Sequence, residues 1–128
     1  MINDNSARPF APIHLAKTRQ DDDFELNYIH LLKEVSLRIE KVTKFKKGQL
    51  ICWMPNLKNR NFPEYGEPVI ITSILTQPVY DPSEVTASSP YFREPLTLTI
   101  GRIVDGDFVE YHVDGRRFEP FFIKVMGS

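Results

Sequence analysis

The sequence predicts an α+β protein in which one long helix precedes five antiparallel strands. Three patterns support this prediction: apolar residues recur with a helical period over 21–43, they alternate with a period of two beyond residue 44, and two Asp-Gly dipeptides mark turns. The chain has 128 residues, of which 41% are hydrophobic and 26% charged, as in an ordinary globular domain. We therefore expect the helix and the strands to form a single small soluble domain.

Residues 1–20 have no hydrophobic period, and Pro9 and Pro12 interrupt any helix there. We expect this segment to be a flexible N-terminal arm. A tail of this kind can also be a peptide that docks on a partner, and the sequence leaves that alternative open.

An amphipathic helix is predicted over 21–43, where three aspartates at its start place capping oxygens and negative charge at the positive end of the helix dipole. Seven apolar residues fall within an arc of about 100°, the width of a core-facing stripe: Phe24, Tyr28, Leu31, Leu32, Val35, Ile39 and Val42. Leu26 and Leu37 lie on the opposite side. They are either tolerated surface residues or a second contact, such as a homodimer interface.

Strands are expected at 49–54, at 69–76 and over three segments between 96 and 120, with a long loop after each of the first two. The second of these loops, at 80–92, is polar and contains Pro82 and Pro90, so we expect disorder there.

The sequence predicts the last three strands most directly. If Asp105-Gly106 is a two-residue turn, it pairs apolar residues with apolar residues: Ile103 with Phe108, Ile100 with Tyr111, and Leu98 with Val113. A second turn at Asp114-Gly115 would then pair Tyr111 with Phe118. The two turns together predict an antiparallel meander.

Five strands in this order, with two long loops followed by tight hairpins, resemble the SH3-like barrels, including Tudor and ribosomal KOW-type modules. The resemblance covers roughly residues 45–121 and concerns architecture only. It implies a small five-stranded barrel over 44–128, with the long loop after the first strand lining a ligand groove.

Charge and cysteine content restrict the function further. The formal net charge is −1, from 16 basic and 17 acidic residues, which argues against bulk attraction to nucleic acid or to an anionic membrane. The single cysteine, Cys52, cannot form an internal disulfide and lies among apolar residues, so we expect a small buried side chain. Neither a secretory signal nor a membrane span is evident, and we expect a cytoplasmic location.

The sequence contains no catalytic signature. None of His14, His30 and His112 has zinc-ligand spacing, and there is no phosphate-binding glycine loop, so we expect neither a metal nor a cofactor. On the meander register, one polar constellation forms on the outer sheet face and would be able to do acid–base work: Thr99, His112, Arg117, Glu110 and Glu119. Its simpler interpretation is a solvated polar face with cross-strand charge pairs.

The loop over 53–66 has the composition of a recognition surface, with aromatic residues, amides and cations. Its candidate binding residues, together with three from the second long loop, are Trp53, Lys58, Arg60, Phe62, Tyr65, Tyr91, Phe92 and Arg93. Trp53 fits a place in the core equally well.

We therefore expect a non-enzymatic protein-binding or regulatory module, which would act as a subunit, adaptor or inhibitor within a larger bacterial or phage assembly. The first alternative is a nucleic-acid-binding module, in which cations contact phosphates and aromatic residues stack on bases: Lys58, Arg60, Arg93, Arg116 and Arg117. Residues 44–128 contain equal numbers of basic and acidic residues, which ranks this alternative second. A small enzyme that uses His112 ranks third.

Overall fold

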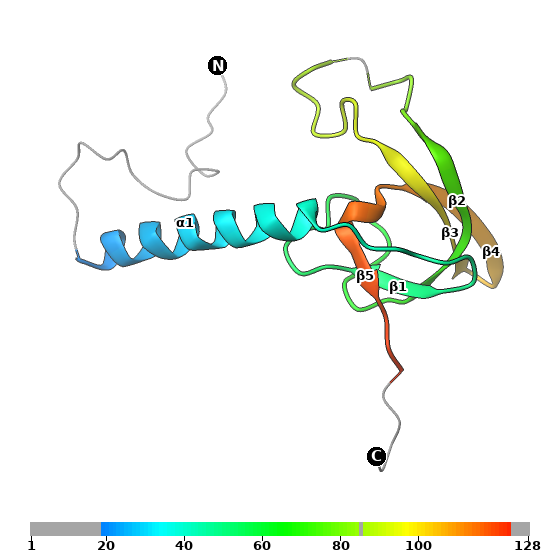
Figure 1. Ribbon diagram of the computed structural model, residues 1–128, viewed down its shortest axis with the longest axis horizontal. Helices are drawn as coiled ribbons and strands as arrows, with labels where there is room; N and C mark the ends of the chain where they lie inside the picture. The colour runs from blue at the N-terminus through cyan, green and yellow to red at the C-terminus, as the bar shows by residue number, and fades with distance from the viewer. Residues whose placement is uncertain (1–18, 85, 124–128) are drawn as a thin grey trace, which may run out of the picture. The chain divides into compact units, whose positions relative to one another are not determined.

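The computed structural model describes residues 19–84 and 86–123 of the chain. It contains one helix followed by a five-stranded antiparallel sheet, which confirms the predicted α+β class (Figure 1). The elements are, in order, α1 (Arg19–Glu40), β1 (Leu50–Trp53), β2 (Val69–Val79), β3 (Leu96–Val104), β4 (Asp107–Val113), the one-turn 3₁₀ helix η2 (Gly115–Arg117) and β5 (Phe118–Pro120).

The chain divides into two compact units, residues 1–40 and 41–128, and each is described by itself. The expectation that helix and strands form one domain stays a prediction. Most of the predicted flexible arm, at 1–18, lies outside the described residues. In the loop where we expected disorder, the described residues form successive turns, such as those closed by the hydrogen bonds from Glu84 N to Asp81 O and from Ser89 N to Thr86 O.

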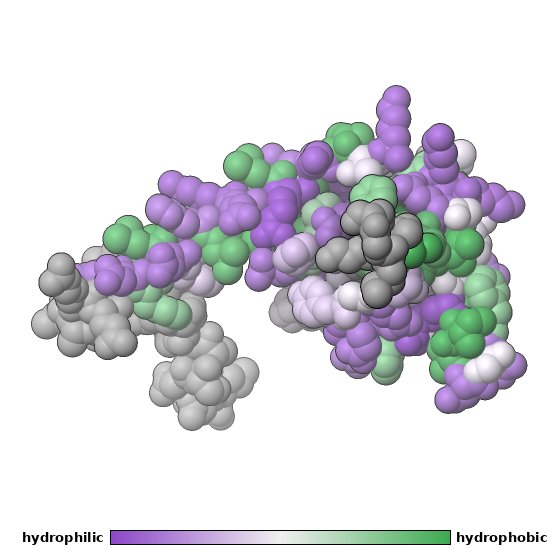
Figure 2. Space-filling model, turned by 90° about the horizontal axis from the view of Figure 1, so that it is seen from below, coloured by the Kyte–Doolittle hydropathy of each residue, from purple (hydrophilic) through white to green (hydrophobic). Residues whose placement is uncertain are grey.

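Helix α1 begins two residues earlier than predicted and ends at Glu40 rather than at residue 43. The apolar stripe that we expected to face a core is not buried, since Phe24 is 48% exposed and Leu32 51% exposed. Hydrophobic and hydrophilic surface alternate along the helical segment in Figure 2. The period of the sequence thus predicts the helix correctly, but a periodic pattern does not state what covers its apolar side. Within the described residues, no helix is long and apolar enough to cross a membrane.

The sheet has the strand order β4-β3-β2-β1-β5, with every neighbouring pair antiparallel. Its hydrogen-bonded strands do not close into a barrel, because β4 and β5 form the two edges. Alternate residues of β1, β2 and β3 supply a single core, together with one residue each from β4 and β5, as a half-buried sheet requires. The buried residues of this core are Ile51, Trp53, Val69, Ile71, Leu98, Ile100, Val113 and Phe118.

The predicted register between β3 and β4 is confirmed at all three apolar pairs, including Ile100 with Tyr111 and Leu98 with Val113. Asp105 and Gly106 have φ angles of 51° and 87°, so both turn residues adopt the left-handed conformation of a type I′ turn. Ile103 and Phe108 face each other as predicted, but on the outer side of the sheet.

The second predicted turn is wrong, because Phe118 does not pair with Tyr111. Phe118 pairs with Trp53 instead, so that β5 adds to β1 at the far edge of the sheet. The buried Asp114 carboxylate accepts a hydrogen bond from Arg116 N (3.0 Å) and caps η2. Gly115 does not have the positive φ of a type I′ turn, and it is crowded: an added Cβ would lie 3.0 Å from the Leu98 and Thr97 side chains.

The buried Trp53 makes a contact that links the core to the loop between β1 and β2. Its indole Nε1–H donates to the Pro63 carbonyl oxygen (2.6 Å), and its ring stacks on Phe118 with centroids 4.2 Å apart.

We predict that Trp53→Phe lowers the free energy of unfolding by about 1–3 kcal/mol, because a buried carbonyl loses its donor. Urea unfolding followed by circular dichroism measures this loss. The exposed Phe122→Leu is the control, and equal stability of wild type and Trp53→Phe would contradict the role of the hydrogen bond.

Candidate functional site

The loop between β1 and β2 carries most of the predicted binding residues, but Trp53 is not among those on the surface. Its side chain is only 3% exposed and belongs to the core, which decides between the two interpretations of the sequence. Through its bond to Pro63, it fixes the loop just after Phe62. Phe62 and Tyr65 are 53% and 55% exposed. The structure therefore anchors the loop from within and presents its aromatic residues outward.

Arg102 of β3 holds two exposed aromatic residues in place. Its guanidinium makes a two-point contact with Glu67, from Nε to Oε2 (2.7 Å) and from the terminal nitrogen to Oε1 (3.1 Å). The same group lies 4.9 Å from the centroid of the Phe62 ring and donates to the Tyr111 hydroxyl (3.3 Å). Phe62 and Tyr111 come from segments far apart in the sequence, and this arginine orients both.

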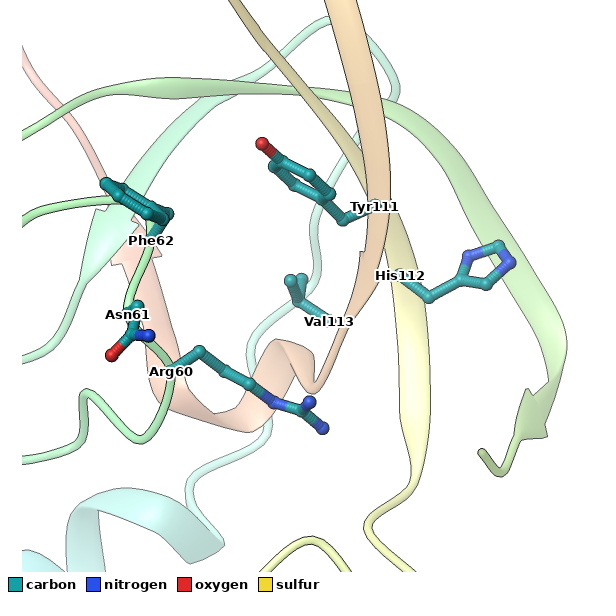
Figure 3. A pocket seen from close by; sticks show the side chains of 6 residues that line it. All are labelled: Arg60, Asn61, Phe62, Tyr111, His112 and Val113. Atoms are coloured by element: carbon teal, nitrogen blue, oxygen red, sulfur yellow. The ribbon is translucent and has the colours of Figure 1, made fainter. Parts of the chain in front are cut away.

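A pocket of about 260 Å³ lies between the loop and β4. Arg60, Asn61 and Phe62 line it from the loop, and Tyr111, His112 and Val113 from the strand. In Figure 3, the side chains of Tyr111 and Val113 lie on the side of β4 that faces Phe62, and the His112 ring points away. The His112 imidazole is therefore outside the pocket, whose wall combines two aromatic rings with an arginine and an amide.

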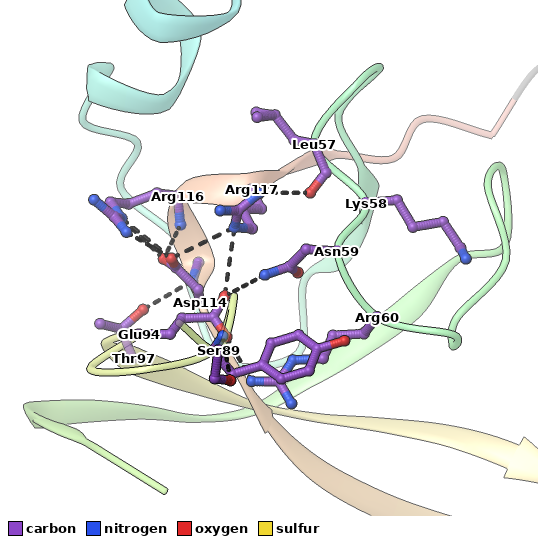
Figure 4. A network of polar contacts seen from close by, with 12 residues as sticks. Leu57, Lys58, Asn59, Arg60, Ser89, Glu94, Thr97, Asp114, Arg116 and Arg117 are labelled. Carbon is purple, nitrogen blue, oxygen red and sulfur yellow. Dashed lines mark hydrogen bonds and ion pairs between the residues drawn. The ribbon is translucent and has the colours of Figure 1, made fainter. Parts of the chain in front are cut away.

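Next to the pocket, two buried carboxylates connect three segments (Figure 4). Glu94, whose side chain is 6% exposed, accepts from Asn59 Nδ2 (2.8 Å) and pairs with Arg60 and Arg117. Asp114, with a fully buried side chain, pairs with Arg116 (2.8 Å). This hydrogen bonding raises the pKa of the Arg116 guanidinium, so the arginine stays charged. The network ties the β1–β2 loop to the segment before β3 and to η2.

The remaining predicted binding residues pair locally as cations on aromatic rings. The Arg60 guanidinium lies 3.9 Å from the Tyr91 ring centroid, and Lys58 Nζ lies 5.8 Å from that of Tyr65. Arg93 stands 5.8 Å from the Tyr80 ring. The half-buried Phe92 and the two helix leucines, Leu26 and Leu37, make no such contact among the described residues.

The polar constellation predicted for catalysis is assembled only in part. Thr99 Oγ1 and His112 Nδ1 lie 3.0 Å apart, and Glu110 accepts from Thr72 Oγ1 (2.7 Å). Because β5 pairs with β1, Glu119 lies opposite Cys52 at the other edge of the sheet.

Arg117 is likewise absent from that face, since it donates to the Leu57 carbonyl oxygen (3.1 Å) and pairs with Glu94. Cys52 itself is half-buried, and its burial, with Glu119 nearby, raises the pKa of the thiol.

Two functional residues were not foreseen. Arg102 occupies an inward position of a strand that otherwise alternates cleanly, with Leu98 and Ile100 before it, and a charge at such a position is a signal that sequence reasoning can use. Glu94 gives no comparable signal, because its partners lie more than 20 residues away in the chain.

No group of three histidine, cysteine or acidic residues within 19–84 and 86–123 could hold a metal ion. In comparisons with known proteins, no family model, curated protein or solved structure matches the chain.

Hydrogen bonding to Arg102 lowers the pKa of Glu67. A carboxylate with a lowered pKa stabilises the fold above its unfolded-state pKa of about 4.3, and that contribution is lost as the pH falls through the folded-state value. We predict that the free energy of unfolding decreases more steeply below about pH 4.3 in the wild type than in Glu67→Gln. Urea titrations between neutral and acidic pH measure both slopes. The exposed Glu64→Gln is the control for the loss of one carboxylate from this loop, and identical slopes for the wild type and Glu67→Gln would contradict the pairing.

The Glu94 network predicts a second stability effect. Glu94→Ala leaves Arg60 and Arg117 without their shared carboxylate, and we expect a loss of about 1–3 kcal/mol, below that for a fully buried pair because both arginines reach solvent. Glu94→Gln keeps an acceptor and should cost less. Chemical denaturation measures both variants, and a Glu94→Ala protein as stable as the wild type would show that the network does not hold the loops.

Proposed function

We propose that residues 41–128 are an SH3-like arrangement of five strands, left open between β4 and β5, that acts as a non-enzymatic protein-binding module, such as an adaptor or regulatory subunit. The support for the SH3-like arrangement is the strand order: β2, β3 and β4 follow one another in the sheet, and a one-turn helix then leads β5 back to pair with β1. The long loops after β1 and β2 agree with the same architecture. Function has to be argued from the site, since folds of this kind serve many functions.

The observation that carries the proposal is the pair of exposed aromatic residues, Phe62 and Tyr111, held by Arg102 beside an open pocket. Aromatic side chains dominate the energetics of protein interfaces. Rings that are already oriented in the free protein lose little conformational entropy on binding, so Phe62 and Tyr111 favour association. The binding surface that we propose is therefore the groove between residues 60–62 and β4.

The size of the pocket favours a protein partner over a small molecule. Small-molecule sites usually measure about 300–1,000 Å³ and enclose most of their ligand. A pocket of about 260 Å³ suits one or two side chains of a partner, with Asn61 at its rim as a hydrogen-bonding group.

Both alternatives have less support. Arg60, Arg116 and Arg117 would be phosphate contacts in a nucleic-acid-binding module, but they pair with Glu94 and Asp114. An enzyme would need the residues around His112 to converge, and two of its five expected groups lie elsewhere. Location within the cell and the identity of the assembly stay predictions.

The test is affinity capture from the lysate of the native host, with three tagged versions of the chain side by side. Wild type should retain a stoichiometric protein partner after nuclease treatment, and Phe62→Ser should lose it, because one of the two aromatic rings of the pocket is gone. Phe122→Ser is the matched control, since it removes a phenylalanine that is 82% exposed and is not among the residues that line the pocket.

Thermal unfolding of all three versions shows whether the loss reflects binding rather than misfolding. A partner that Phe62→Ser captures as well as the wild type does would place the interface elsewhere. Capture that disappears with nuclease would instead favour the nucleic-acid alternative.

A further inference from the structure

Strand β4 presents an unprotected edge. It pairs with β3 along all seven of its residues without a shift in register, and it has no second neighbour among the described strands. Proteins usually protect such an edge with proline, lysine, a bulge or a very short strand. The other edge strand, β5, has three residues and ends in Pro120. None of these devices is present in the sequence of β4, Asp-Phe-Val-Glu-Tyr-His-Val.

The turn geometry identifies the backbone groups that point away from the sheet. In a two-residue type I′ hairpin, the residues flanking the turn, Val104 and Asp107, form a hydrogen-bonded pair. Hydrogen-bonded and non-hydrogen-bonded pairs then alternate along an antiparallel ladder. The N–H and C=O groups of Phe108, Glu110 and His112 therefore face the free edge, and all three residues are exposed.

We infer that this edge pairs with the β4 edge of a second copy of the chain, antiparallel about a two-fold axis at Tyr111. In this register, Glu110 lies opposite His112 of the partner subunit, and the symmetry repeats the pair. On the other face, Val109 meets Val113 of the partner subunit, next to the central pair of tyrosines. Each outward backbone group at residues 110 and 112 finds a partner, a carboxylate meets an imidazole on the outer face, and valines and tyrosines meet on the other face.

The neighbouring registers are less favourable. If one strand slipped by a single residue, backbone groups that face the free edge would lie opposite groups that face β3, and the hydrogen bonds would not form. Only registers in which each residue's partner changes by two positions are therefore possible. Pairing about Glu110 would place two carboxylates opposite each other. Pairing about His112 would place two imidazoles opposite each other and leave Glu110 without an imidazole partner. Pairing about Val109 would oppose Glu110 to Phe108 and Asp107 to Tyr111.

In the single chain, both polar side chains bond to neighbouring strands on the side away from the free edge. Thr99 Oγ1 lies at hydrogen-bond distance from His112 Nδ1, and Thr72 Oγ1 donates to one oxygen of Glu110. Pairing would therefore use Nε2 of His112 and turn the Glu110 carboxylate from Thr72 toward the edge. Side chains directly opposite each other in an antiparallel pair have Cβ atoms about 4.5–5.5 Å apart, within reach of a carboxylate–imidazole hydrogen bond. The inference does not depend on the proposed binding function, because it rests on the free backbone groups of β4 and on the pairing of Glu110 with His112, although Tyr111 and Val113 belong to both surfaces.

The test is sedimentation equilibrium of the full chain over a wide range of protein concentration. We expect a monomer–dimer equilibrium, in which Glu110→Lys and His112→Glu each weaken association by about tenfold or more, because each places two unfavourable pairs in the interface. The double variant Glu110→Lys/His112→Glu restores an opposite-charge pair and should return to within about threefold of the wild type. Leu26→Ser/Leu37→Ser controls for association through the helix and should dimerise normally.

A second measurement does not depend on any substitution. Amide exchange followed by NMR should show that the N–H groups of Glu110 and His112 become more protected as protein concentration rises, whereas the N–H of Tyr111, already bonded within the ladder, does not. A chain that is monomeric at all concentrations would overturn the inference. So would a dimer that Glu110→Lys leaves intact, or one that the helix variant abolishes.

Discussion

The pairing of Trp53 with Phe118 is the interaction on which the rest of residues 41–128 depends. The two rings stack at 4.2 Å in the middle of the core, and the same pair sets the register between β1 and β5. Through its indole N–H, Trp53 also holds the carbonyl of Pro63, which follows Phe62. One buried aromatic pair thus places the last strand and one wall of the pocket together.

Polar contacts around this core fix the positions of the exposed aromatic rings and of the loops. Arg102 extends from an inward position of β3 to Glu67, Phe62 and Tyr111. It therefore holds the two exposed rings in fixed positions relative to the sheet. Glu94 does the same for the other end of the loop through Arg60. Arg60, Arg102 and Arg117 therefore pair with carboxylates that fix the loops, which a count of charges in the sequence does not show.

The predictable part of the fold is the part set by local rules. The β3–β4 hairpin follows from Asp105-Gly106 and from alternation, and its register is confirmed pair by pair. The turn after β4 was mispredicted because the Asp114 side chain caps a 3₁₀ helix, a choice that depends on its burial and not on the dipeptide. The partners of Glu94 lie far from it in the sequence, so local patterns could not predict them either.

The most direct test of this account is a nuclear Overhauser spectrum of the isotopically labelled chain, because the position of β5 determines both the core and the pocket. With β5 beside β1, we expect strong contacts between the Trp53 indole and the Phe118 ring, and a contact from Phe62 or Arg102 to Tyr111. Contacts between Phe118 and Tyr111, without any between Phe118 and Trp53, would place β5 beside β4. That result would contradict the account, since the free edge of β4 and the wall of the pocket would both be lost.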